Sequence, residues 1–539
     1  MLNRNRPLRR LAPLLVYAAL LLTCGCGKQP ADPDVGLPDD ALTGELPGKT
    51  PFKANAADDV FSLAYNPEMS LNPITTRSED NILVSELVYE TLVRVDNDYQ
   101  WHPNLISDCT TSDGVWWVFT VDTTRAFSDG TPVTPKDCAY SIQRAQRAAR
   151  FSGRLRNVYG ASAISETQFA VSLAKADMLF PARLVIPVIP YGSGNLDYPL
   201  GTGPYAFSTD CTSLVVNAVW PQADSLPLDT IYLRATVLAE DRIAEFEDGL
   251  IDLVVHDPGG TSNLGYGGVT DARLFHTTNL HYLGINQKNV MFRYPACRFA
   301  LHFAVNRAYI TNTLLGGTAV QTVLPLPPSC PYYLSSYTDR LRFDLDKCKT
   351  ILNNAGLDDY DEDGQLEFME AGIPAELNLR MIVCSDSTTK LEAARRIVSD
   401  LNGIGLPVTL SELDWNSYTN ALANGEFDLY YAEVMLTPDW DLTELFAEGG
   451  TLNFMGETDP NYLSYIDQFL AAPDEELRQQ CGKILLEYVA ETAPIIPICF
   501  ERHQVLTRRD VVSGMSPTQY NVFDNIAEWK VDLGRTQEK

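Results

Sequence analysis

The sequence predicts an α/β protein with more than one domain, and three observations support this prediction. The chain has 539 residues, which is too many for a single hydrophobic core. Residues 380–384 and 408–413 have strand patterns, and a helical stripe that ends at Gly403 separates them, so this segment is a βαβ unit with parallel strands. From Val60 onward, short apolar runs alternate with turns.

The composition is that of a globular protein with an acidic surface. Hydrophobic residues make up 45% of the chain, and its formal net charge at pH 7 is −29. Such a surface repels phosphate backbones, so we expect no nucleic-acid partner. The charge favours a protein that works outside the cytoplasm, but it does not identify a ligand.

The first 26 residues have the pattern of a bacterial lipoprotein signal peptide. Arginines between residues 4 and 10 precede an apolar run over residues 11–22, which is too short to span a bilayer. Gly25 before Cys26 fits a lipidation site better than Thr23 before Cys24, so we predict Cys26 as the lipidated residue and keep Cys24 as the alternative. The lipid would be the only membrane attachment, and residues 27–59, rich in Pro, Asp and Gly, would form a flexible tether.

No catalytic motif is present in the sequence. There is no HExxH, GxSxG or Walker pattern, and the six histidines have no paired ligand spacing. The nine cysteines beyond residue 26 have no CxxC, so buried free thiols are favoured over a disulfide framework. We therefore predict a protein that is not an enzyme.

Residues 127–145 predict a turn followed by a capped helix. Asp129-Gly130 is a turn dipeptide. Thr134 is expected at the N-cap, with Pro135 at the first helical position and Asp137 completing a capping box. Cys138, Ile142 and Ala145 share one face, so the helix docks on a larger body. A further helix is expected around 85–93.

The same run resembles the signature of the extracellular solute-binding proteins of family 5, the peptide- and nickel-binding components of ABC importers. The pattern is roughly F-x-D-G-x-P-(V/L)-T-A-x-D-V-x-Y-S, followed by a hydrophobic residue, any residue and Arg. The matching residues are Phe127, Asp129, Gly130, Pro132, Thr134, Asp137, Tyr140, Ser141 and Arg144. Residues 201–205 (GTGPY) and 281–286 (HYLGIN) resemble two further elements of the family, and residues 292–310 resemble the helix that follows the second of them.

The resemblance covers about residues 60–530 and implies a bilobal α/β fold. This is the periplasmic-binding-protein-like fold of type II, in its larger cluster, with an additional domain. The implied division is lobe I over 60–84, 186–282 and 495–539, the additional domain over 85–185, and lobe II over 283–494.

The resemblance also implies a function in solute uptake. The chain would be the lipid-anchored, extracytoplasmic component of an ABC importer, which captures oligopeptides between two lobes and delivers them to a permease driven by an ATPase. One alternative is another solute on the same fold, such as a nickel chelate or an oligosaccharide, although no histidine lies near the expected cleft segment in the sequence. A surface peptidase is the alternative from a different class.

The ligand-binding residues that the resemblance implies lie between residues 414 and 441. In peptide-binding members a Trp lines a side-chain pocket, and an Asp after a strand that begins F-D neutralises the ligand's α-amine. Trp415 matches the first position, but Thr437 occupies the second. Asp439, Asp441 and Glu433 are the candidates to replace that Asp. Whether α-amines are recognised at all depends on this departure, because an unpaired buried ammonium costs several kcal/mol.

An acidic loop predicts a structural calcium site away from the cleft. Asp359, Asp361, Asp363, Gly364 and Glu370 fit the pattern D-x-D-x-D-G-x5-E of a twelve-residue calcium loop. The flanking segments have the patterns of a helix and a strand, unlike the two helices that usually enclose such a loop. Ca²⁺ is the one metal that the sequence suggests, and we expect that no other cofactor is required.

Overall fold

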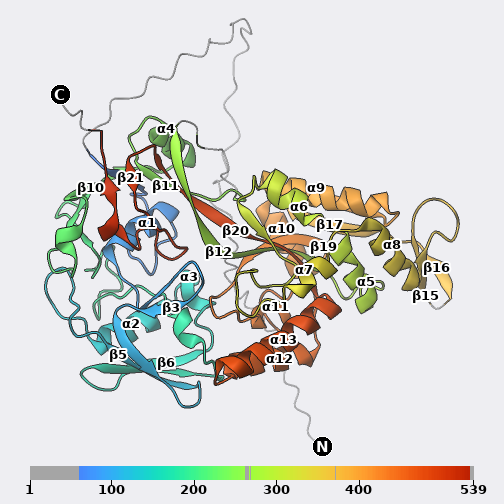
Figure 1. Cartoon of the computed structure of the whole chain (residues 1–539), viewed down its shortest axis with the longest axis horizontal. Helices are drawn as coiled ribbons and strands as arrows, with labels where there is room; N and C mark the ends of the chain where they lie inside the picture. The colour runs from blue at the N-terminus through green and yellow to red at the C-terminus, as the bar shows by residue number, and fades with distance from the viewer. Residues whose placement is uncertain (1–59, 261–265, 267–268, 371, 535–539) are drawn as a thin grey trace, which may run out of the picture.

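The computed structural model describes residues 60–260, 266, 269–370 and 372–534 (Figure 1). The predicted signal peptide and tether, with Cys24 and Cys26, lie outside the described residues. Among the residues described, no helix is both long enough and apolar enough to cross a bilayer. The expectations for the leader, the anchor and the tether therefore stay predictions.

The described chain has two large hydrophobic cores, one in each half of the molecule. The strands β12 (Thr270–Ile285) and β20 (Ile495–Arg508) pass from one core to the other (Figure 1). Phe275 and Val505 pack in the first core, whereas Leu280 and Phe500 pack in the second. This arrangement confirms the predicted bilobal α/β fold and identifies β12 and β20 as the connection between the lobes.

The N-terminal half contains two four-stranded sheets that share one core. The first sheet has the order β1 (Ser62–Tyr65), β10 (Thr230–Ala235), β9 (Ser213–Val216) and β8 (Tyr205–Phe207). The second has the order β4 (Ile106–Thr110), β5 (Trp116–Val121), β7 (Gln168–Leu173) and β6 (Val158–Ala163). The short strands are β2 (Val93–Val95), β3 (Trp101–Pro103), β21 (Val512–Ser513) and β22 (Lys530–Val531), and the helices are α1 (Glu79–Val88), α2 (Pro135–Ala145), α3 (Ala149–Ser152) and α4 (Ala239–Glu247). The second sheet lies within segment 85–185, but the predicted domain limits themselves stay predictions.

Helix α2 begins as the sequence predicts. Thr134 is its N-cap, and the backbone N–H of Thr134 donates to Asp137 Oδ2 at 2.8 Å, which completes the capping box. Cys138, Ile142 and Ala145 are buried in the core that α2 shares with the second sheet. The signature run therefore contributes a helix to the hydrophobic core of the N-terminal half.

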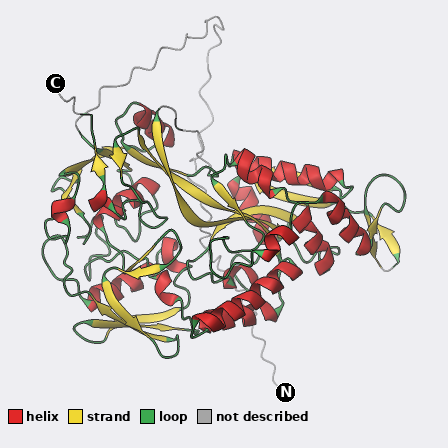
Figure 2. Cartoon of the chain, viewed as in Figure 1, coloured by secondary structure: helices red, strands yellow, loops and turns green. Residues whose placement is uncertain are grey.

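The C-terminal half is built on a seven-stranded sheet, and Figure 2 shows most of the long helices in this half. The strand order is β11 (Leu253–His256), β20, β12, β19 (Leu429–Met435), β17 (Leu379–Cys384) and β18 (Val408–Leu413), and β13 (Ala319–Gln321) also pairs with β20. β17, α9 (Thr388–Gly403) and β18 form the predicted βαβ unit, since the two strands are parallel. The other helices are α5 (Pro295–Ala300), α6 (Arg307–Tyr309), α7 (Ser336–Arg340), α8 (Leu345–Asn354), α10 (Trp415–Asn424), α11 (Thr443–Phe446), α12 (Pro460–Ala471) and α13 (Glu475–Thr492), and a small sheet contains β14 (Leu357–Asp358), β15 (Glu367–Glu370) and β16 (Ile373–Ala375).

Two predicted helices differ from the structure. The helix expected around 85–93 begins earlier, at Glu79, because Ser78 caps it, and Val93 belongs to strand β2. The helix expected over 292–310 is broken into α5, a 3₁₀ turn and α6. The break occurs where the Asn306 side chain accepts a hydrogen bond from Tyr309 N at 3.0 Å and starts a new helical turn.

The described cysteines are all free, and most of them are buried. Cys138, Cys297, Cys330, Cys348, Cys384 and Cys499 are buried, whereas Cys109, Cys211 and Cys481 are half-buried. Burial raises the pKa of Cys348 to about 12, so this thiol stays protonated and packs as a small apolar group.

Candidate functional site

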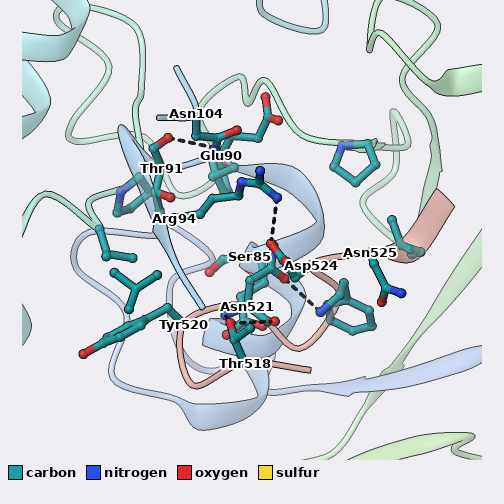
Figure 3. Close-up of a pocket in the computed structure, with 18 of the residues that line it drawn as sticks. Ser85, Glu90, Thr91, Arg94, Asn104, Thr518, Tyr520, Asn521, Asp524 and Asn525 are labelled. Carbon is teal, nitrogen blue, oxygen red and sulfur yellow. Dashed lines mark hydrogen bonds and ion pairs between the residues drawn. The ribbon is translucent and has the colours of Figure 1, made fainter. Parts of the chain in front are cut away.

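A cavity of about 820 Å³ lies in the N-terminal half and reaches strand β19 of the other half. Its lining comes from residues 85–95, 150–154, 220–225 and 518–528, and Figure 3 shows part of it. Met435, the last residue of β19, lines it from the C-terminal half. The volume is within the range of roughly 300–1,000 Å³ for sites that bind small ligands.

Glycines of the GTGPY run hold the α1 end of the cavity in place. Gly203 N donates to the carbonyl oxygen of Val88, the last residue of α1, at 2.9 Å. A Cβ at Gly201 would lie only 1.9 Å from the same oxygen, so a larger residue cannot approach the helix this closely. Tyr89 and Glu90, which follow directly, are lining residues of the cavity.

Four arginines line the cavity, and they differ in their partners. Arg94 Nη1 lies 3.3 Å from Asp524 Oδ1 (Figure 3), and Arg125 pairs with Glu90. Arg150 and Arg154 form no ion pair with a carboxylate in the described part of the chain. Arg150 Nη1 donates to the carbonyl of Pro73, and Arg154 Nη1 to that of Val185, each at 3.2 Å. Since a guanidinium has five N–H donors, both arginines have donors left to bind an anionic partner.

Glu86 lies beside Arg150 in the cavity wall. Its Oε2 accepts a hydrogen bond from Val522 N at 2.7 Å. Burial raises the pKa of Glu86 to about 7, against the opposing effects of that hydrogen bond and of Arg150. Burial also lowers the pKa of Arg150 to about 10. Near pH 7, Glu86 is thus partly protonated, and only its charged fraction competes with an anionic ligand for the Arg150 guanidinium.

Tyr520 provides an aromatic surface for the second unpaired arginine. The Arg154 guanidinium carbon lies 5.2 Å from the centre of the Tyr520 ring, which is cation–π distance. Both residues line the cavity, and the Tyr520 ring limits the positions that the Arg154 side chain can take.

The residues expected to bind ligand are not among those that line the cavity. Trp415 begins α10, is half-buried, and packs on Tyr418 with 6.2 Å between ring centres. Met435 lines the cavity, and Glu433 lies two residues before it and Thr437 two residues after it. The Thr437 hydroxyl is buried and has no hydrogen-bond partner among the described residues.

Asp439 and Asp441 belong to a buried ion cluster, the Arg183 cluster, which also contains Asp177. Arg183 Nη2 donates to Asp441 Oδ2 at 2.7 Å, and Arg183 Nε pairs with Asp439 and lies 3.3 Å from Asp177 Oδ2. Burial, with Asp439 nearby, raises the pKa of Asp177 well above its usual range. Although burial opposes it, Arg183 holds the pKa of Asp441 below its ordinary value. Asp439 and Asp441 are therefore already paired with Arg183, a cationic side chain of the protein itself.

Glu433 belongs to a second buried group, the His281 cluster, with His281, Lys390 and Glu501. Lys390 Nζ lies 2.5 Å from Glu433 Oε2, and His281 Nε2 lies 3.7 Å from the same oxygen. Although burial opposes it, Lys390 lowers the pKa of Glu433 to about 2. Burial lowers the pKa of His281 to about 4, so the imidazole is neutral near pH 7.

The position of His281 corrects one argument from the sequence. No histidine lies near residues 414–441 along the chain, but strand pairing places His281 directly opposite Glu433. The third candidate acid is thus paired as well, and a histidine adjoins it. The HYLGIN run carried the signal for this histidine, but its partner on β19 follows only from the sheet register.

The acidic loop between β14 and β15 brings four carboxylates together. Those of Asp359, Asp361, Asp363 and Glu367 offer oxygens within 4.8 Å of one another. Glu367 Oε1 and Asp359 Oδ1 are buried without a hydrogen-bond partner among the described residues. Glu370 is exposed and is not part of this group. Because it is three residues beyond Glu367 on the same strand, it points to the opposite face.

Comparisons with known proteins agree with this architecture. The model of the bacterial extracellular solute-binding proteins, family 5 (middle region), matches residues 100–451. The nickel-binding periplasmic protein of Escherichia coli is 23% identical over 496 residues, covering 85% of this chain and 92% of that protein. Two solved structures are 17% identical to this chain and cover 88% of it: the ABC transporter substrate-binding protein CtaP of Listeria monocytogenes (TM-score 0.72, 100% of that chain) and the oligopeptide-binding protein AppA of Bacillus subtilis in complex with a nonapeptide (TM-score 0.62, 98% of that chain).

Proposed function

Because the chain belongs to the bacterial extracellular solute-binding proteins of family 5, the solute-binding components of ABC importers, we propose that its solute is an oligopeptide. Proteins of this family are transport components without enzymatic activity, and they work with permease and ATPase subunits. The peptide would occupy the cavity, be enclosed between the lobes, and pass to the permease unchanged.

The observation that carries this proposal is the pair of unpaired arginines. Arg150 and Arg154 line a cavity in a protein whose net charge is −29, and no described carboxylate forms an ion pair with either of them. Two guanidinium groups in such a place are suited to an incoming carboxylate, which they bind by charge-assisted hydrogen bonds. We assign them to the C-terminal carboxylate of the peptide.

The peptide's amine would be recognised weakly in this mode. Asp439 and Asp441 are paired with Arg183, and Glu433 with Lys390. Breaking such a buried pair to bind an ammonium would leave an uncompensated charge. Met435, which lines the cavity, would contact the peptide instead. Thr437 follows two residues later, and its buried hydroxyl lacks a hydrogen-bond partner among the described residues.

Other carboxylate-bearing solutes are the second candidate, and a nickel chelate is one of them. The arginine pair supports any such solute equally. The sequence argument against a metal was that no histidine lies near residues 414–441, and the position of His281 beside Glu433 removes it. An oligosaccharide without a carboxylate would leave both guanidinium groups without a partner.

Native mass spectrometry of the purified protein tests the proposal most directly. A co-bound ladder of peptide masses is expected, and peptides added afterwards should bind saturably and remain intact. Amidation of the peptide's C-terminus should weaken binding strongly. A peptide that is cleaved would indicate a peptidase, and a bound metal chelate without peptide would favour the second candidate.

We also propose that the chain is lipidated on Cys26. Its support is the leader pattern in the sequence, with Cys24 as the alternative. Metabolic labelling with a fatty acid should be lost in Cys26→Ser and retained in Cys24→Ser. The reverse result would move the lipid to Cys24, and retention in both variants would contradict an anchor at either position.

A structural Ca²⁺ bound to Asp359, Asp361, Asp363 and Glu367 is a separate proposal. It is supported by the two unpartnered buried oxygens, since a hard cation prefers oxygen ligands. At a hundred times its dissociation constant, Ca²⁺ would add about 2.7 kcal/mol of stability. Glu367→Gln should abolish this effect, whereas Glu370→Gln should retain it. Unchanged thermal stability after addition of a chelator would contradict the site.

A further inference from the structure

Three side chains that lie far apart in the sequence converge where strand β11 ends. Asp257 follows β11, whereas Glu501 and His503 lie on β20. The two strands are antiparallel with His256 opposite Gln504, so the same register places Asp257 opposite His503. Each of the three offers an atom within 4.8 Å of the other two, and His503 Nε2 lies 3.6 Å from Asp257 Oδ1.

Two of these side chains have buried polar atoms without a hydrogen-bond partner. Glu501 is 0% exposed, and its Oε1 has no such partner in the described part of the protein. The same holds for Nε2 of His503, since 3.6 Å from Asp257 is beyond hydrogen-bond distance. A buried polar atom without a partner destabilises the folded state, so a shared partner at this position would be stabilising.

The neighbouring residues orient both carboxylates toward this position. Glu501 Oε2 lies 3.2 Å from His281 Nε2, and His281 Nδ1 lies 3.1 Å from the Tyr431 hydroxyl. Gly259 N donates to Asp257 Oδ1 at 2.9 Å. A Cβ at Gly259 would lie 2.4 Å from Glu501 Oε1, so only glycine allows this loop to close over the glutamate. Such outer contacts are typical of metal ligands.

We propose that Asp257, Glu501 and His503 bind a divalent first-row transition-metal ion of the Zn²⁺ class. One imidazole nitrogen and two carboxylate oxygens suit such an ion, whereas Mg²⁺ and Ca²⁺ prefer oxygen ligands alone. Three protein ligands leave a coordination position open for water or for a donor atom of a solute. The side chains of Asp257 and His503 are 26% and 19% exposed, so an ion can enter from solvent.

The position of the site gives the ion a role in holding the lobes together. The loop that carries Asp257 is held by the start of helix α9 in the C-terminal half. Ser387 Oγ donates to the carbonyl of Gly259 at 2.8 Å, and Thr389 Oγ1 to that of Pro258 at 3.4 Å. The metal would join the Asp257 loop to β20, which connects the lobes. It would therefore stabilise the arrangement of the two lobes in which this loop contacts α9.

Titration with Co²⁺ tests the proposal. The parent protein is the full chain without an affinity tag and with Asp361→Asn, which weakens metal binding by the acidic loop. One Co²⁺ should bind saturably, with an absorption spectrum of nitrogen and oxygen coordination, and Zn²⁺ but not Mg²⁺ should displace it. Glu501→Gln and His503→Gln should each weaken binding at least about 100-fold. His281→Asn, which removes an orienting contact only, should weaken it about 10- to 100-fold.

The control variant is His102→Asn, because His102 is exposed and pairs with Asp96; its Co²⁺ affinity should match that of the parent. If near-ultraviolet circular dichroism shows that Glu501→Gln is not folded, Asp257→Asn replaces it. The absence of saturable Co²⁺ binding would overturn the proposal, and so would full affinity in the ligand variants. A thiolate-to-cobalt band would place the ion on cysteine and overturn it as well.

Discussion

The cavity and the Arg183 cluster are both built from arginines and carboxylates, but they use them in opposite ways. In the cluster, one guanidinium with 3% exposure meets three aspartates, and two of them are the expected ligand acids. In the cavity, Arg150 and Arg154 donate to backbone carbonyls, and no carboxylate among the described residues forms an ion pair with either of them.

The difference shows which charges remain available for a ligand. A buried pair that is broken by removing one partner leaves a charge in a medium of low dielectric constant, so the cluster is costly to open. An arginine that lines a cavity loses little when it exchanges water for a carboxylate. The Arg183 cluster therefore joins Asp177 of the N-terminal half to Asp439 and Asp441 of the other half, and the cavity recognises the solute.

Replacing Arg183 should have the largest effect. Arg183→Ala leaves Asp177 and Asp439 buried without a cation, so the free energy of unfolding should fall by about 3–5 kcal/mol. Urea denaturation measures this change. In Arg342→Ala, which breaks an exposed pair with Asp339, it should fall by less than about 1 kcal/mol. Equal losses in both variants would remove the distinction between the cluster and an ordinary surface pair.

Replacing Arg154 should mainly affect binding. Arg154→Ala removes hydrogen bonds to a charged group worth about 1.5–3 kcal/mol, so the affinity for a peptide with a free carboxylate should fall about 10- to 100-fold. Isothermal titration calorimetry measures it. Arg147 is exposed, and Arg147→Ala is the matched control with unchanged affinity. If amidated and free peptides respond equally to Arg154→Ala, this arginine does not meet the carboxylate.

The pH dependence of binding should identify Glu86 as a competitor for Arg150. The pKa of Glu86 is about 7, so it gains its charge as the pH rises through 7 and then pairs more strongly with Arg150. The affinity for a carboxylate should fall over this window, by up to about tenfold, and Glu86→Gln should abolish the dependence. The exposed Glu476→Gln should retain it. An affinity that rises with pH would contradict this assignment.

Blocking the peptide's amine should have the smallest effect. Because Glu433, Asp439 and Asp441 are already paired with protein cations, N-acetylation should change the affinity less than about twofold. Competition between acetylated and free peptides measures it. Thr437→Asp restores a carboxylate at the position where the family pattern has one, and it should create a preference for free amines. A loss of more than about tenfold on acetylation of the wild-type ligand would mean that one of the three acids leaves its partner.

Local sequence patterns predicted much of the fold. The capping box at Thr134 and Asp137 and the βαβ unit predicted over 380–413 both depend on residues within a short stretch. Sequence reasoning failed where a competing local signal decided. Ser78 capped α1 earlier than expected, and the Asn306 side chain interrupted the helix over 292–310.

Motifs of contiguous residues were enough to predict the family, the two-lobed fold and the acidic loop. The pairing of the candidate acids could not be predicted in this way, since Arg183 lies more than 250 positions before its partners Asp439 and Asp441. Strand alternation likewise places Glu367, and not Glu370, beside the three aspartates of the acidic loop. Pairing between distant strands, which brings His281 to Glu433 and Asp257 to His503, is set by sheet register, and no local pattern of residues encodes that register.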